Sequence, residues 1–379
     1  MMITFQTIFI YLGLTFILFL SAKTSIKKKS YAPLFWGLFF YSVIFGLRYG
    51  VGTDYFSYLN SYLSPSSDLG FREAERGFYL FTRFFADLDM PFTVYFGVIA
   101  FLQISLIFYS ERPNKFIYPF LALTFMLECV WLSYANIMRQ SLAFSFFAVA
   151  LSFAERKKIV LHYVFILLAI SIHMSAVYLI LIYPIYILVR KRGHGFLGTK
   201  IQLILFVVAV FLGNDLFIGK YIYQIDDFTA LVGYDSYTTS ADMHEFLLKS
   251  EETRLGIGYY LSLLVHILLI SYGNKICDYY KNERLSFIYK LFFVGSVLSY
   301  LFASSMMLTR SIMYLHGFGF IIGAYVLYYL KKSARKVQII LLLSLYCLIF
   351  SGIMYRMYDN DSAYYFIWQS EMVPKSKMY

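Results

Sequence analysis

Four arginines stand at the borders of long apolar runs, and this is where the sequence offers the clearest chemistry. They are Arg48, Arg139, Arg254 and Arg310. An arginine at the end of an apolar helix often extends its charged group to the lipid headgroups. Several arginines at one depth also suit a shared anion, because guanidinium stays charged and grips phosphate oxygens through paired hydrogen bonds. Both interpretations stay open for each arginine.

Two titratable side chains lie at similar borders and are candidates for proton transfer. His173 follows Ile172 at a short polar break between two apolar runs, and Asp54 lies a few residues after Arg48. A histidine or a carboxylate within reach of a hydroxyl group is a candidate general base. The alternatives are a hydrogen-bonded structural histidine and an aspartate that caps a helix.

The segment 48–62 is polar and aromatic, although it follows directly on an apolar run. It contains a cation, a carboxylate and several tyrosines. Polar groups at the edge of a hydrophobic helix usually have a function. We therefore expect Tyr55 and Tyr58 to contact a substrate together with Arg48.

The elements that position these residues are predicted to be membrane helices. Of the 379 residues, 60% are hydrophobic, 21% are aromatic and only 15% are charged. The apolar runs are long enough for helices that cross a hydrocarbon core of about 30 Å. We predict an all-α, polytopic integral membrane protein that forms a single transmembrane domain over residues 1–379. About twelve spans are expected, near residues 5–22, 32–47, 92–109, 116–133, 141–154, 159–172, 176–189, 201–218, 255–272, 287–304, 312–330 and 337–354.

The distribution of basic residues predicts the orientation of these spans. Most of the 33 Lys and Arg residues lie in the short loops after every second span. The positive-inside rule places such loops in the cytoplasm. Both termini and the arginine borders then face outward, together with the loops 48–91 and 219–254 and the tail 355–379.

The first outward loop contains a predicted helix between Glu73 and Leu88. Phe78, Phe81, Phe85 and Leu88 recur there at helical spacing, with charged residues on the other faces. The pattern is typical of an amphipathic helix in the membrane interface. A helix packed within the loop is the alternative.

Several classes of function are disfavoured. The net charge of +11 comes from short loops and not from a basic stripe, so we expect no nucleic-acid partner. The sequence has no G-x-x-x-x-G-K-[ST] motif for a nucleotide. Cys129, Cys277 and Cys347 show no paired spacing, so neither a disulfide framework nor a metal site is indicated. We expect no cofactor.

Five short motifs carry a resemblance to a known family, and this resemblance covers nearly the whole chain. They are Arg48-Tyr-Gly-Val-Gly-Thr-Asp54-Tyr-x-x-Tyr58, Glu75-x-Gly77-Phe-Tyr, Asn136-Ile-Met-Arg139-Gln140, Ile172-His173-x-Ser175-Ala and Arg310-x-x-x-Tyr314. With these motifs the sequence resembles the EpsG family, which is similar to the Wzy-type polymerases of O-antigen, capsule and exopolysaccharide. Arg76 departs from the small residue or proline expected before Gly77.

The resemblance implies a glycosyltransferase at the outer face of the bacterial cytoplasmic membrane. Its substrate would be an undecaprenyl-diphosphate-linked oligosaccharide, and the growing chain would pass to a hydroxyl group of the next lipid-linked unit. Arg48, Arg139 and Arg310 would clamp the diphosphate, with Arg254 as a further contact, and His173 or Asp54 would be the base. The expected partners are the bilayer and, in the cell, a flippase and a chain-length regulator.

Two other functions fit part of the same pattern. A lipid-linked oligosaccharide flippase or transporter can also have twelve spans, but it needs charged groups in a cavity open to each side in turn. The polar groups here gather at one edge, which disfavours transport. An O-antigen ligase or related outer-face transferase uses the same arginine and histidine chemistry and differs only in its acceptor.

Overall fold

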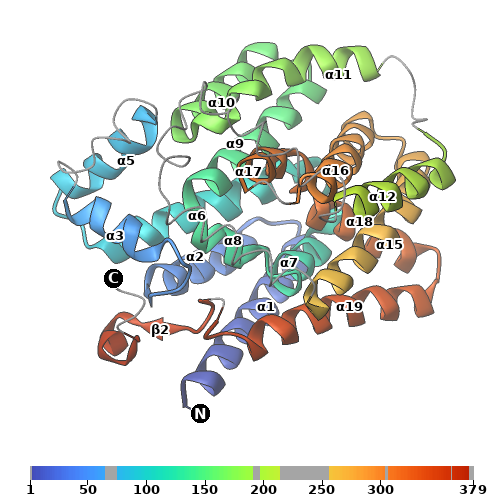
Figure 1. Ribbon diagram of the computed structural model, residues 1–379. Helices are drawn as coiled ribbons and strands as arrows, with labels where there is room; N and C mark the ends of the chain where they lie inside the picture. The colour runs from blue at the N-terminus through green and yellow to red at the C-terminus, as the bar shows by residue number, and fades with distance from the viewer. Residues whose placement is uncertain are drawn as a thin grey trace. The chain divides into compact units, whose positions relative to one another are not determined.

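The computed structural model describes residues 2–64, 75–190, 197–213, 256–303, 306–359 and 361–374. These residues are mostly helical, with two strands of two residues each (Figure 1). The all-α prediction is therefore confirmed. The predicted outward loop 219–254, including Arg254, lies outside the described residues.

The chain divides into two compact units. The first comprises Met1–Ile187 and Gly323–Tyr379, and the second comprises Leu188–Ile322. That the two act as a single transmembrane domain stays a prediction.

The first unit is built on long apolar helices packed side by side. Helix α9 packs against α10 and α6, α2 packs against α6 and α1, and α1 packs against α7. Aromatic rings fill the core, where Tyr11 stacks on Trp131 with ring centroids 3.9 Å apart. The helices of this packed core are α1 (Met2–Lys28), α2 (Ala32–Gly46), α6 (Phe92–Ser110), α7 (Tyr118–Leu127), α8 (Val130–Asn136), α9 (Met138–Glu155), α10 (Ile159–Ile172) and α19 (Lys336–Tyr355).

The connections of the first unit also contain helices. Between α2 and α6 lie α3 (Tyr55–Leu63) and α5 (Arg76–Asp87). The 3-10 helices are η1 (Arg112–Ile117), η2 (Met174–Leu181) and, in the tail, η4 (Ile367–Met372).

The second unit is a smaller group of helices around α16. Helices α12 and α17 pack closely on α16, and α15 contacts both α12 and α16. The side chain of Asn282 caps α16 by accepting a hydrogen bond from the main-chain N–H of Leu285 at 2.7 Å. The bounds are α12 (Thr199–Gly213), α15 (Ile257–Tyr280), α16 (Glu283–Leu301) and α17 (Met306–His316); α11 (Ile182–Arg190) and α18 (Gly319–Lys332) cross the boundary between the units.

Where the structure describes them, the predicted spans fall mainly on helical segments, but the count of twelve is not confirmed. Within the described residues, six helices are long and apolar enough to cross a membrane, or seven if the bent pair Arg112–Leu127 and Val130–Asn136 is one span. That pair turns by 64° at its break, where Cys129 has φ of 58°. Four further apolar helices are shorter.

A two-stranded antiparallel sheet joins the Arg48 segment to the tail. Strand β1 (Arg48–Tyr49) pairs with β2 (Tyr365–Phe366), so that Arg48 lies opposite Phe366. Helix α1 reaches the same tail, because the Tyr11 hydroxyl donates to the Ser362 carbonyl at 2.9 Å. The start of α1, the Arg48 segment and the tail therefore share one end of the first unit (Figure 1). That this end faces outward stays a prediction.

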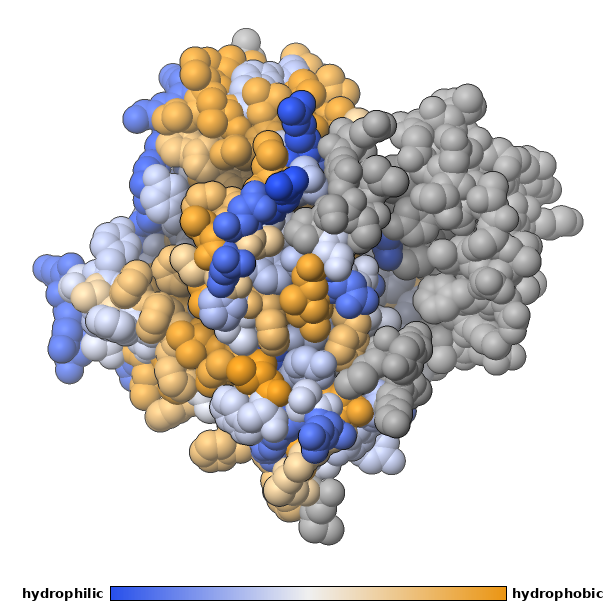
Figure 2. Space-filling view, turned by 90° about the vertical axis from the view of Figure 1, so that its left-hand side faces the viewer, coloured by the Kyte–Doolittle hydropathy of each residue, from blue (hydrophilic) through white to orange (hydrophobic). Residues whose placement is uncertain are grey.

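Helix α5 packs within the first unit, which was one of the two alternatives for it, and its place in the membrane interface stays a prediction. Its inner face buries Phe78, Thr82 and Phe85, and it packs against α3 and α10. Its outer face exposes Phe84, which is 60% exposed. Leu88 follows the last residue of α5 and is also exposed. Figure 2 shows hydrophobic areas broken by hydrophilic stretches on this side of the molecule.

Candidate functional site

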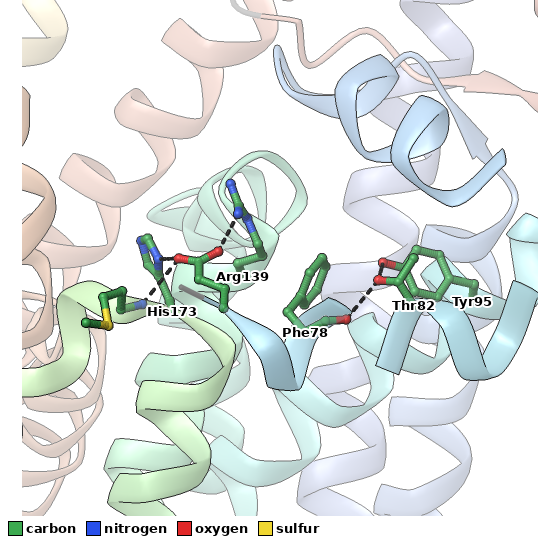
Figure 3. Close-up of polar contacts among 7 residues, drawn as sticks. Phe78, Thr82, Tyr95, Arg139 and His173 are labelled. Atoms are coloured by element: carbon green, nitrogen blue, oxygen red, sulfur yellow. Dashed lines mark hydrogen bonds and ion pairs between the residues drawn. The ribbon is translucent and has the colours of Figure 1, made fainter. Parts of the chain in front are cut away.

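A buried carboxylate, that of Glu75, gathers three donors from distant parts of the chain. Arg139 forms an ion pair with Oε2, and Nδ1 of His173 contacts Oε1. The main-chain N–H of Met174 donates to the same Oε1 at 3.2 Å. Figure 3 shows Arg139 and His173 on either side of this carboxylate. Two residues that the sequence singled out separately therefore belong to one cluster.

A close approach of two helices fixes the position of Glu75. This residue precedes α5, and Gly77 at the start of α5 lies directly on the end of α10. A Cβ atom on Gly77 would lie 2.8 Å from the carbonyl oxygen of Ser171 and 2.4 Å from its Oγ. Only glycine fits here without a shift of one helix, which explains the Glu75-x-Gly77 spacing.

Arg139 lies in the first turn of α9, just after a break in the helical path. Helix α8 ends at Asn136 and Ile137 leaves the helical conformation before α9 begins. Gln103 of α6 secures this break, because its side-chain amide donates to the carbonyls of Tyr134 and Met138 at 3.1 and 3.0 Å. The break directs the side chain of Arg139 towards Glu75.

His173 lies at the end of α10, where the chain changes direction. Its backbone is extended, with φ of −149° and ψ of 117°, while its N–H still donates to the Ala169 carbonyl at 2.9 Å. The 3-10 helix η2 follows at once with Met174. This turn presents the imidazole and the N–H of Met174 together to Glu75.

The electrostatics keep the carboxylate charged at neutral pH. Burial acts to raise the pKa of the Glu75 carboxyl, but the hydrogen bond from His173 and the charge of Arg139 outweigh it and lower the pKa. The side chain of Glu75 is only 8% exposed, whereas those of Arg139 and His173 are 17% and 14% exposed. The cation and the imidazole thus form the accessible part of the cluster.

The aromatic rings of Tyr58 and Phe78 lie beside the guanidinium group of Arg139. Its guanidinium carbon lies 5.7 Å from the ring centroid of Tyr58 and 5.9 Å from that of Phe78. Burial raises the pKa of the Tyr58 hydroxyl, although the charge of Arg139 opposes this. Tyr58 therefore stays a neutral hydrogen-bonding group beside the cation. Its contact with substrate stays a prediction.

The structure places Arg48 deep within the first unit, where it is 1% exposed. Its guanidinium donates to the carbonyls of Phe45 and Ala135 and contacts the sulfur of Met138 at 3.1 Å. The ring of Tyr55 lies 5.7 Å from the guanidinium, and the Tyr55 hydroxyl donates to the Arg48 carbonyl at 3.1 Å. These contacts tie the end of α2 to the α8–α9 break. The sequence predicts that Arg48 and Tyr55 contact a substrate. Their hydrogen bonds and ring contacts within the protein do not support this role, and it stays a prediction.

Three predicted site residues remain, namely Asp54, Arg310 and Arg254. Asp54 occupies the N-cap position of α3 without a capping hydrogen bond from its side chain, while its N–H donates to the Asn136 side chain at 2.8 Å. Arg310 lies on α17 in the second unit and is half-buried. Arg254 is outside the described residues. The roles given to these three residues stay predictions.

Glu75 was not among the site residues predicted from the sequence. The Glu75-x-Gly77 motif was visible, and it is the one local signal that marks this carboxylate. Its partners are 64 and 98 residues away along the chain, so no local spacing connects them.

The cluster contains one group that can bind an anion and one group that can accept a proton. Within the residues that the structure describes, no group of three His, Cys, Asp or Glu side chains is placed to hold a metal ion. A guanidinium can bind phosphate oxygens, and an imidazole next to it can accept a proton.

These features define a polytopic membrane protein with a polar site at the ends of its helices. A sequence profile of the EpsG family matches residues 34–369, and the chain belongs to this family. The match confirms the resemblance drawn from the five motifs. The family is associated with membrane proteins of the polysaccharide-polymerase type. No curated protein and no solved structure matches the chain significantly.

Proposed function

We propose that the protein is a polysaccharide polymerase that joins lipid-diphosphate-linked oligosaccharide repeats. The observation that carries the proposal is the convergence of Arg139 and His173 on Glu75, in a member of the EpsG family. The growing chain would pass from its lipid diphosphate to a hydroxyl group of the next lipid-linked repeat. This transfer needs one group that stabilises the diphosphate and one that accepts a proton.

Arg139 is the proposed diphosphate contact. It is partly exposed and stands in the first turn of α9, where the positive end of the helix dipole also favours an anion. A well-placed donor to a developing negative charge contributes on the order of 3 kcal/mol to the transition state. The diphosphate leaves as a stabilised anion, so a general acid is not required.

His173 is the proposed base, and Asp54 is the alternative. A positioned base contributes roughly 10²- to 10⁴-fold to the rate. His173 is favoured because it lies next to Arg139 through their common partner Glu75. In this proposal Arg48 supports the break that carries Arg139, and the roles of Arg310 and Arg254 stay predictions.

The proposal also assigns a lipid carrier, a membrane face and partner proteins. Undecaprenyl diphosphate in the bacterial cytoplasmic membrane is the proposed carrier, and the reaction is placed at the outer face because basic loops predict that orientation. A flippase would supply the repeat units, and a chain-length regulator would act on the product.

A purified protein in liposomes with lipid-linked repeat units provides the direct test. Arg139→Ala should lower chain extension by about 10²-fold or more, since one donor to the leaving group is worth that much. Arg83→Ala is the matched control, because Arg83 is an exposed arginine on α5 that pairs with Asp87. Equal polymer lengths for the two variants would remove Arg139 from the diphosphate site.

A deletion strain separates the proposed polymerase from its two rivals. Loss of a polymerase leaves single repeat units exported and attached to the final acceptor. Loss of a flippase leaves lipid-linked repeats on the inner leaflet, and loss of a ligase leaves finished polymer on its lipid carrier. Either of these last two outcomes contradicts the proposal.

A further inference from the structure

The three donors around Glu75 determine where the proton on His173 must lie. An ionised carboxylate accepts hydrogen bonds and cannot donate them. The lowered pKa of Glu75 keeps it ionised, and Arg139 and the N–H of Met174 already donate to it. The Nδ1 atom of His173 must therefore carry a hydrogen in its contact with Oε1.

We propose that Glu75 is a positioning residue that holds His173 in the tautomer with the proton on Nδ1 and a free lone pair on Nε2. The proposal rests on the proposed polymerase function and deepens its account of the base. Nε2 of His173 then takes the proton of the acceptor hydroxyl as that oxygen bonds to the anomeric carbon of the growing chain. The bond from this carbon to the diphosphate oxygen breaks, and its electron pair leaves with the diphosphate.

The contacts of α5 show that Glu75 is a fixed part of the site. Gly77 meets the backbone of Ser171 at the end of α10, and the Thr82 hydroxyl hydrogen-bonds the Tyr95 hydroxyl of α6 at 2.9 Å (Figure 3). The packing of α5 thus fixes the position of the Glu75 carboxylate, in addition to the hydrogen bonds from its partners. A fixed carboxylate orients an imidazole through Nδ1–H, as in the acid-histidine pairs of hydrolases.

A purely structural role for Glu75 makes a different prediction. If Glu75 served only to hold Arg139, its loss would weaken the stabilisation of the leaving diphosphate and lower kcat, but the tautomer of His173 would not change. Loss of a residue that sets the tautomer of the base changes that tautomer and lowers kcat together. The direct readout is the tautomer itself, which does not depend on activity.

Nitrogen-15 NMR of histidine-labelled protein at mildly alkaline pH measures the tautomer. The chain has six histidines, so the spectrum of His173→Gln identifies the signals of His173 by difference. In the native protein we expect a protonated Nδ1 and an unprotonated Nε2 at His173. The opposite tautomer in the folded native protein would overturn the proposal, whatever the variants do.

Glu75→Gln and Asp87→Asn form a matched pair for the kinetic test. Both remove one carboxylate charge near the same helix, but Asp87 is exposed at the far end of α5. Glu75→Gln should shift His173 away from the Nδ1-protonated tautomer and lower kcat by about 10²-fold, within the range that a base contributes. Asp87→Asn should leave both quantities unchanged, and Glu75→Asp should restore the native tautomer and part of kcat.

The outcomes separate this proposal from the proposed function. Native protein that makes no polymer from lipid-linked repeats contradicts the polymerase function, while the NMR result still decides how Glu75 holds His173. Native protein that polymerises, with Glu75→Gln at the same kcat or with the same His173 tautomer, contradicts the positioning role alone. A shifted tautomer together with a lowered kcat supports both.

Discussion

The contact between Gly77 and Ser171 allows a test of the site that leaves every polar residue in place. Gly77→Ala adds one methyl group where α5 meets α10. Its Cβ would lie 2.8 Å from the Ser171 carbonyl oxygen, which is 0.6 Å closer than the 3.4 Å at which ordinary van der Waals contact begins. The contact with Ser171 Oγ at 2.4 Å is 1.0 Å too close. Either the start of α5, with Glu75 two residues away, or the end of α10, with His173 two residues away, must move by a similar amount.

The size of the effect follows from this displacement. Overpacking of a tight contact by a methyl group costs typically 1–3 kcal/mol, so we expect the free energy of unfolding to fall by about 2 kcal/mol. A misplacement of about 1 Å in a reacting arrangement costs on the order of 10²-fold in rate. Chain extension should therefore fall far more than the small loss of stability would produce.

The assay compares two glycine variants and one suppressor. Gly352→Ala on α19 is the matched control, because no atom lies within 4 Å of the added Cβ; we expect wild-type polymerisation from it. Ser171→Gly removes two of the three close atoms and should partly restore the activity of Gly77→Ala. If Gly77→Ala polymerises at the wild-type rate, the contact does not position Glu75 and the explanation of the motif is wrong.

Three further predictions concern the residues around the site. Arg48→Met should lower the free energy of unfolding by about 2 kcal/mol, because buried carbonyls of Phe45 and Ala135 lose a charged donor; unchanged thermal stability with lost polymerisation would instead indicate a direct substrate contact. Asn136→Ala should cost about 1 kcal/mol in a denaturant titration through loss of its hydrogen bond to the Asp54 N–H, and a stability equal to wild type would show that water replaces this bond. The pKa of Glu75 is lowered on folding from its ordinary value of 4.5, so its stabilising effect is complete above that value and is lost as the pH falls through the folded pKa. The Tm of native protein should therefore fall more steeply below about pH 4.5 than that of Glu75→Gln, and parallel curves would contradict the ion cluster.

The helices were predictable from the sequence because their signal is local. Apolar runs mark the segments that must satisfy their backbone groups internally, and the described parts of the predicted spans fall mainly on helix. Helix α5 was predicted from the helical spacing of apolar residues such as Phe78 and Phe85. Both of these residues are buried on one face of the helix. The number of true spans did not follow, because several apolar helices are short or interrupted by breaks such as the one at Cys129.

The site was predictable only in part, because single unusual residues are visible in a sequence whereas contacts between distant residues are not. Arg139 and His173 stood out because charged or titratable groups at helix ends are unusual. Their meeting at Glu75 depends on contacts across 64 and 98 residues, which no local pattern encodes. Arg48 illustrates the converse, because a buried arginine and an accessible one can both follow an apolar run in the sequence.

The pairing of β1 with β2 links the question of membrane sidedness to the end of the chain. The tail is tied through Arg48–Tyr49 to the α8–α9 break that carries Arg139. A topology reporter fused after Tyr379 would therefore report the compartment of the proposed reaction as well as the location of the terminus. Two separate fusions, one to a phosphatase that is active only in the periplasm and one to a fluorescent protein that is fluorescent only in the cytoplasm, would determine from which side the site receives its substrate.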